Sequence, residues 1–224
     1  METNVQVFRG FFDSKVKIQN VSQQEQLLIK PILVKLSLLV GISVLLSAIL
    51  GIVGYQSEEI SKQVGQQSLE YIEALQFYHI VGIALKGLLT PVFYLFFSVL
   101  LTYYLLKEIR VGVLVHIHLL FIWLILLNQM VELVLFYFWG IPAISSPISL
   151  GIVAQILLDH PLFIHILTEV NLIYIGGLVY LTILLQSVST KQRVEIGLIV
   201  FLVHFILALA GAGISVINIE EWMN

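Results

Sequence analysis

The sequence predicts an all-α integral membrane protein, a bundle of five transmembrane helices. Of 224 residues, 59% are hydrophobic and only 11% are charged, and the mean hydropathy is +1.00. Soluble domains have about 45–50% apolar and about 25% charged residues. Charged residues also divide the chain into five long apolar runs. Only helices and closed barrels satisfy their backbone in lipid, and the alternating strands of a barrel are absent, so we expect helices.

The first 35 residues are expected to form a cytoplasmic segment with an amphipathic helix. Over residues 3–29, apolar side chains such as Phe8, Phe11 and Phe12 accompany basic residues such as Lys15 and Lys17. This combination suits a helix that lies in the headgroup layer. The alternative is an irregular tail with a few aromatic side chains that dip into the membrane.

The transmembrane domain is expected to cover residues 36–217. A helix needs about 20 apolar residues to cross a hydrocarbon core of roughly 30 Å. The five expected spans cover about residues 36–54, 79–106, 111–138, 162–185 and 196–217. Two short extracytoplasmic surface helices are expected between them. One lies within residues 56–78, where apolar residues have helical spacing, and one begins at Ser146 and Pro147 and ends near His160.

The basic residues predict the orientation of the spans. Cytoplasmic connections carry an excess of Lys and Arg. Nine of the eleven basic residues fall on one side of a five-span alternation, namely Arg9, Lys15, Lys17, Lys30, Lys35, Lys107, Arg110, Lys191 and Arg193. We therefore expect a multi-pass protein of the cell membrane with a cytoplasmic N-terminus and an outside C-terminal tail, residues 218–224.

A cluster of ionisable residues is expected roughly 10 Å below the outer boundary, from a rise of about 1.5 Å per residue. Lys86, Glu132 and Glu169 reach this depth from three spans, with Asn128 one turn from Glu132 and His165 one turn from Glu169. Ionisable residues inside a bilayer usually face the bundle or water. The cluster indicates either the wall of an outward-facing cavity or ion relay, or an interhelical Lys86–Glu132 pair that sets helix register.

Small residues recur at four-residue intervals and predict helix-packing faces, either within the chain or toward a partner. Such strips allow the backbones of two helices to approach closely. The residues are Ser43, Ser47 and Gly51 in the first span, Gly176 and Gly177 in the fourth, and Ala208, Gly211, Ala212 and Ser215 in the fifth.

The sequence contains none of the common catalytic signatures, and we expect no catalytic residue, cofactor or metal site. The zinc-peptidase motif, the serine nucleophile turn and the phosphate-binding loop are all absent. The acidic pair Glu58 and Glu59 lacks the arginine of intramembrane CAAX-type proteases, because that position is Gln63. His116 and His118 point about 200° apart on a helix and cannot chelate one ion together. Zero cysteines exclude disulfides, and the net charge of −3 argues against nucleic acid as a partner.

The order of these parts resembles a known family. An amphipathic N-terminal stretch, Val7-Phe8-Arg9-Gly10-Phe11-Phe12, precedes Ile29-Lys30-Pro31-Ile32-Leu33 at the start of the first span. An acid and a glycine-containing stretch from Glu169 to Gly177 later precede the basic loop Ser189-Thr190-Lys191-Gln192-Arg193. This is similar to bacterial members of the Yip (Ypt/Rab-GTPase-interacting protein) membrane family. The resemblance implies five spans, a cytoplasmic N-terminus and an outside C-terminus.

The same resemblance implies a non-catalytic, permease-like transport accessory that assists assembly of other membrane proteins, including ABC-type export or efflux complexes. The Asp-Leu-Tyr-Gly-Pro motif of eukaryotic relatives is absent, and the later spans contain no counterpart of their Gly-Tyr motif, so Rab binding is not carried over. The expected partners are thus the lipid bilayer and other membrane proteins, with self-association left open. A small transporter or channel that uses Lys86, Glu132 and Glu169 is the alternative.

Overall fold

The computed structural model describes residues 29–158 and 160–216, and within these ranges the regular structure is helical. A single antiparallel bridge between Ser149 and Asn171 is the exception. The all-α prediction is therefore confirmed for the described residues. The expected N-terminal amphipathic helix and the C-terminal tail lie outside them.

Among the described residues, four helices are long and apolar enough to cross a membrane, which makes the chain a multi-pass membrane protein. They are α3 (Ile29–Ile52), α5 (Leu69–Leu105), α6 (Val111–Trp139) and α10 (Arg193–Val216). They coincide with the first, second, third and fifth expected spans. The fourth expected span has a different form.

The segment expected as one span at 162–185 is two helices. The first, α8 (Pro161–Glu169), ends before Val170, and α9 (Leu172–Gln186) begins after Asn171. Asn171 caps α9, because its side-chain oxygen accepts a hydrogen bond from the Tyr174 amide at 2.9 Å. The bridge to Ser149 extends the backbone at the break, where the Leu150 amide donates to the Val170 carbonyl and the Leu172 amide to the Ile148 carbonyl, both at 3.0 Å. An extended segment held by a distant residue cannot continue a helix.

The surface helices also differ from expectation. Most of the helix expected within residues 56–78 is the beginning of α5, which starts at Leu69 and leaves only the short α4 (Glu58–Gln63) separate. Ser68 caps α5 by accepting from the Tyr71 amide at 3.4 Å, and no Gly or Pro interrupts residues 69–81. The helix expected from Ser146 is instead the 3-10 turn η1 (Ala143–Ser145) followed by α7 (Gly151–Leu157).

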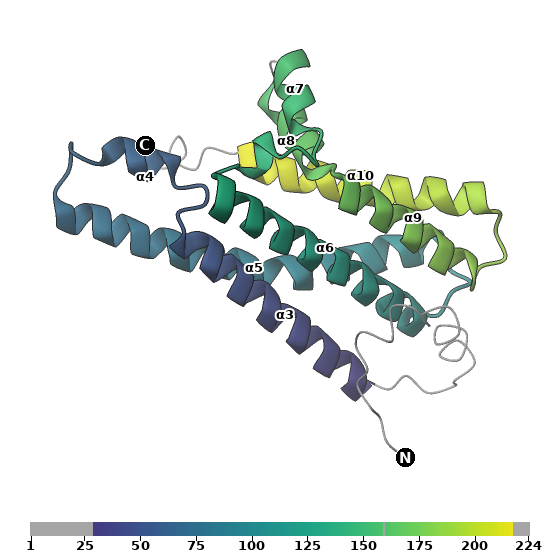
Figure 1. Cartoon of the computed structure of the whole chain (residues 1–224). Helices are drawn as coiled ribbons and strands as arrows, with labels where there is room; N and C mark the ends of the chain where they lie inside the picture. The colour runs from purple at the N-terminus through teal and green to yellow at the C-terminus, as the bar shows by residue number, and fades with distance from the viewer. Residues whose placement is uncertain (1–28, 159, 217–224) are drawn as a thin grey trace.

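The bundle is built around α6, which is the most buried of the four long helices, whereas α5 is the least buried. Helices α3 and α5 pack on one side of α6, and α9 packs on it and on α10. Phe121, Ile117 and Ile122 of α6 are fully buried in the apolar core. Figure 1 shows these long helices running in roughly the same direction, with α7 and α8 projecting sideways.

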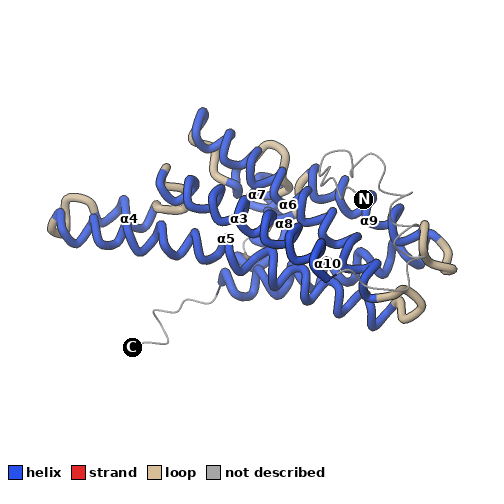
Figure 2. Tube along the Cα trace, turned by 90° about the horizontal axis from the view of Figure 1, so that it is seen from below, coloured by secondary structure: helices blue, strands red, loops and turns tan. Residues whose placement is uncertain are grey.

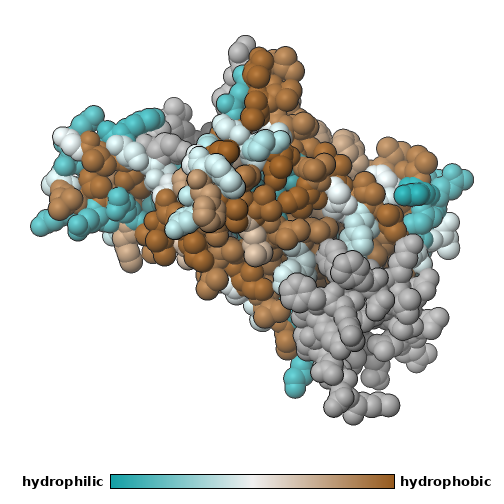
Figure 3. Space-filling model, viewed as in Figure 1, coloured by the Kyte–Doolittle hydropathy of each residue, from teal (hydrophilic) through white to brown (hydrophobic). Residues whose placement is uncertain are grey.

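Hydropathy varies along the bundle as a membrane would require. Figure 3 shows a hydrophobic body with hydrophilic residues at its two ends. One of these ends is formed by α4 and the beginning of α5, which extend beyond the other helices (Figure 2).

Candidate functional site

The end of α3, the part of α5 around His79 and the end of α6 meet at one point near the expected outer boundary. A Cβ on Gly51 of α3 would lie 3.1 Å from the Ile80 Cα of α5, so these two helices touch backbone to backbone. Just beyond, the His79 Nε2 donates to the Tyr55 carbonyl at 2.9 Å. The Tyr55 ring packs edge-on against Phe136 of α6, with centroids 5.1 Å apart. Tyr55 therefore links all three helices.

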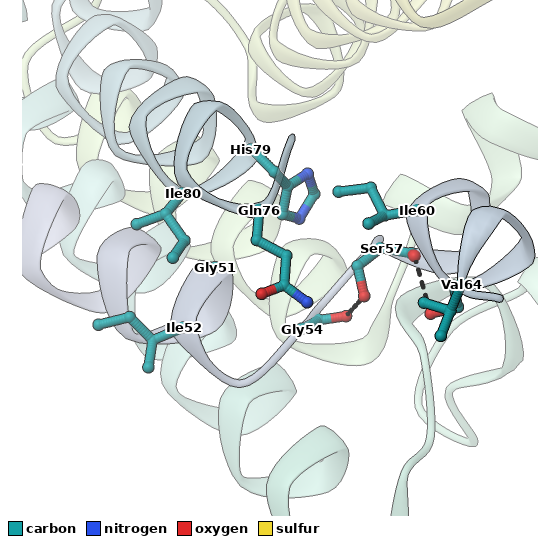
Figure 4. A pocket seen from close by; sticks show the side chains of 10 residues that line it. Gly51, Ile52, Gly54, Ser57, Ile60, Val64, Gln76, His79 and Ile80 are labelled. Atoms are coloured by element: carbon teal, nitrogen blue, oxygen red, sulfur yellow. Dashed lines mark hydrogen bonds between the residues drawn. The ribbon is translucent and has the colours of Figure 1, made fainter. Parts of the chain in front are cut away.

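A small cleft of about 130 Å³ opens beside this junction, between α5 and the turn that connects α3 to α4. Gly54 shapes the turn with a φ of +82°, which favours glycine, and Ser57 Oγ donates to the Gly54 carbonyl at 2.6 Å. In Figure 4, Gln76 and His79 point toward the cleft from α5 and face Ser57. The full lining is Gly51, Ile52, Gly54, Ser57, Ile60, Ser61, Val64, Gln76, His79 and Ile80.

The ionisable residues expected at one depth do come near one another. Asn128 Nδ2 donates to Glu132 Oε1 at 2.7 Å across one turn of α6, and Tyr55 is a further hydrogen-bonding neighbour of Glu132. Lys86 and Glu169 both lie near enough for their charges to act on Glu132. Glu132 is half-buried, and so is His165, one turn before Glu169 on α8.

The hypothesis of a Lys86–Glu132 ion pair does not match this arrangement. Among the described residues, neither Lys86 nor Glu169 forms an ion pair, and both side chains are exposed. Gly87, the next residue of α5, faces α3, and successive residues of a helix point about 100° apart. Lys86 is close enough to Glu132 for their charges to interact, without a direct ion pair.

The small residues of α3 pack within the chain. A Cβ on Gly87 of α5 would lie 2.4 Å from Ser47 Oγ and 2.8 Å from the Ser43 carbonyl oxygen. Both serines are buried. Leucine at Ser43, Ser47 or Gly51 would therefore disturb the fold of this chain itself. Gly87 completes this interface from α5. The residues four positions before and after it are not small, so the four-residue spacing does not identify Gly87 in the sequence.

The small residues of the later helices divide between the interior and the surface. A Cβ on Gly177 would lie 2.8 Å from Phe121 Cε2, so Gly177 makes room for the central ring of the core. Ala212 is buried and Ala208 is half-buried, while Gly176 and Gly211 are exposed. Ser215 belongs to the last turn of α10.

Three histidines lie inside the bundle and bond to their own helices. The Nδ1 atoms of His116, His118 and His204 each donate to the carbonyl four residues earlier at 2.8 Å. The Nε2 of His118 therefore accepts, and its donor is Thr102 Oγ1 at 3.3 Å. Within the described part of the chain, no group of three or more His, Asp and Glu side chains could hold a metal ion.

An aromatic cluster surrounds His204, and the sequence analysis did not identify it. The His204 ring lies 4.9 Å from that of Phe121 and 5.8 Å from that of Tyr94, and Tyr174 is 6.1 Å away. The buried His204 Nε2 and Tyr94 Oη have no hydrogen-bond partner among the described residues. The four rings come from α5, α6, α9 and α10, so only the assembled bundle brings them together.

Comparisons with protein-family models, with curated proteins and with solved structures find no match for this chain.

Proposed function

We propose that this chain is a non-catalytic membrane protein that binds another membrane protein and assists its assembly. The observation that carries this proposal is the arm formed by α4 and residues 69–79, which extends beyond the outer end of α3. The Yip resemblance is the reason to propose an ABC-type export or efflux complex as the partner, and a cell-membrane location with a cytoplasmic N-terminus.

The arm is too long and too polar to lie within the hydrocarbon core. At about 1.5 Å per residue, the 37 residues of α5 measure roughly 55 Å, against a core of roughly 30 Å. A tilt of about 40° still leaves a length that exceeds the core. Glu70 and Glu73 are exposed in the first turns of α5, which places this end of the helix in water.

Large apolar side chains are nevertheless exposed on the arm. Leu69 is 75% exposed and Tyr78 is 69% exposed, and Phe77 and Val64 are exposed to a similar degree. Several large apolar side chains exposed on one segment in water are typical of an interaction site. The segment from residue 56 to 78 carries four glutamates and one lysine, so the matching surface on a partner is apolar with basic residues around it.

Five crossings are part of the proposal. Glu132 lies seven residues before the end of α6, and so roughly 10 Å below the outer boundary. Glu169 lies near Glu132, and Asn171 follows Glu169, so α9 begins near this depth. From that depth, the 15 residues of α9 cover roughly 22 Å, about the rest of the core. The short α9 can then complete the fourth crossing while α8 remains in the outer half.

Photo-crosslinking in the native membrane tests the partner. A photo-reactive residue at Phe77 or Tyr78 is expected to crosslink to a subunit of an ABC-type exporter, and Leu69→Ser is expected to abolish the product. The same probe at Phe97, which is exposed on α5 inside the membrane, is the matched control and should not give it. An exporter product from Phe97 alone, or none from the arm, would refute this function.

Transport is the second candidate function, because polar groups continue from the outer end into the bundle. Tyr174 lies near Glu169, and Tyr94 lies beside Tyr174. His204 follows through its ring contacts with both tyrosines. Ion or solute flux through liposomes that contain only this chain, eliminated by Glu169→Gln, would replace the assembly function by transport.

A further inference from the structure

Lys86 and Glu169 are opposite charges that the chain exposes at a similar depth. Lys86 lies seven residues, or roughly 10 Å, inside His79, which bonds to Tyr55 at the outer end of α3. Both charges lie near enough to act on Glu132, so the three residues belong to the same region of the bundle. Each is exposed, and among the described residues each lacks an ion-pair partner.

An exposed, unpaired charge is costly in the outer half of a bilayer. The Lys86 side chain extends roughly 6 Å toward the outer end of α5. This length is less than the roughly 10 Å depth of Lys86, so the ammonium group stays below the headgroups. Glu169 has a shorter stem and lies next to the bend at Val170. A counter-charge at the same depth stabilises both residues better than the headgroups above them.

The segment that carries Glu169 belongs to a projection (Figure 1), and the helix that carries Lys86 is largely uncovered. α7 and α8 project sideways from the bundle (Figure 1), with apolar residues exposed around the projection, among them Ile156 at 76% and Phe163 at 52%. α5 is the long helix that its own bundle covers least. One turn from Lys86, Gly82 is exposed and has nothing near its Cβ position, so another helix can approach α5 closely there.

We propose that copies of this chain associate in the bilayer, with the α7–α8 projection of one copy against α5 of the next and Glu169 of the first paired with Lys86 of the second. This contact is independent of the arm and of the proposed function. It uses two exposed charges that form no ion pair within the described part of the chain.

Charge exchange between copies tests the pair. The full chain contains no cysteine, so Gln67→Cys in the exposed loop before α5 supplies one dye site, and energy transfer between donor- and acceptor-labelled copies in liposomes measures association. Lys86→Glu alone and Glu169→Lys alone are each expected to weaken association about three- to tenfold. A mixture of the two variants is expected to restore it, because every contact between unlike copies then joins opposite charges.

The controls separate this pair from other roles of the charges. Glu132→Gln changes a half-buried carboxylate at the same depth and is expected to leave association unchanged. Gly82→Leu should weaken association, whereas Gly176→Leu, at an exposed glycine of α9, should not. Should the reversed charges prevent folding, the neutral Lys86→Met and Glu169→Gln are expected to weaken association in the same direction.

Three results would overturn the inference. The first is a wild-type chain that stays monomeric at every protein-to-lipid ratio. The second is a mixture of charge variants that associates no better than each variant alone. The third is association that responds to Lys86→Glu but not to Glu169→Lys, which would mean that Lys86 contacts lipid phosphates rather than the second copy.

Discussion

Replacement of Gly87 by alanine tests the close contact between α3 and α5. The added Cβ would lie 2.4 Å from Ser47 Oγ, 2.6 Å from Ser47 Cβ and 2.8 Å from the Ser43 carbonyl oxygen. Real Cβ atoms do not approach other atoms this closely, so the helices must move apart. Overpacking of a well-packed interior costs about 1–3 kcal/mol, and we expect the upper half of this range because one clash is with backbone.

A second glycine of the same helix provides the reference. Gly82 lies five residues earlier in α5, and a Cβ there meets nothing within 4 Å. Alanine raises helix propensity by up to about 1 kcal/mol over glycine, and this gain is common to both positions. The difference between Gly82→Ala and Gly87→Ala therefore isolates packing, and we expect it to be about 2–3 kcal/mol in the free energy of unfolding.

Reversible unfolding in mild detergent, followed by helical circular dichroism, measures this difference. Ser47→Gly should recover part of the loss in the Gly87→Ala background, because it removes two of the three clashing atoms. The Ser43 carbonyl remains, so full recovery is not expected. Equal stability of Gly82→Ala and Gly87→Ala would show that α3 and α5 do not touch as described.

Three further predictions concern other parts of the chain. A cysteine in place of Lys191 should react with an impermeant reagent only after the cells are opened, and labelling of intact cells would contradict the orientation. The stability changes caused by Lys86→Met and Glu132→Gln should couple only weakly, by about 0.5 kcal/mol, because the two charges act on each other without a direct ion pair, and a coupling well above about 1 kcal/mol would show that they do pair. Thr102→Val should lower the free energy of unfolding by about 1–3 kcal/mol, because it leaves the buried His118 Nε2 without a hydrogen-bond donor. Thr182→Val is the control. It removes only a hydrogen bond within its own helix and should change stability less.

The helices that cross the membrane could be predicted from the sequence because lipid sets both their length and their composition. The break at Val170 and Asn171 could not, because it depends on pairing with Ser149, more than 20 residues away. Asparagine is common at helix caps, but within an apolar run it can equally be a polar residue inside a continuous helix. Local pattern cannot distinguish these two roles.

The sequence predicted which ionisable residues of the candidate site come near one another, but not which of them form direct contacts. Spacing along each helix correctly brought Lys86 and Glu169 near Glu132. The face of α5 that packs on α3, however, is the one that carries Gly87, and Lys86 is exposed and forms no ion pair within the described part of the chain. The ring cluster around His204 joins four helices and has no signature in any one of them.

The bridge between Ser149 and Asn171 allows the length of the α7–α8 projection to change without a change in the rest of the bundle. The chain leaves for α7 and returns from α8 at directly opposed residues, which lie only about 5 Å apart in an antiparallel pair. α8 packs against α10, whereas α7 contacts only α8 and η1 closely. Residues inserted or removed between α7 and α8 would therefore change how far the projection reaches, while the points where it joins α6 and α9 stay in place. The distance that α7 and α8 extend from the bundle can therefore change independently of the other helices.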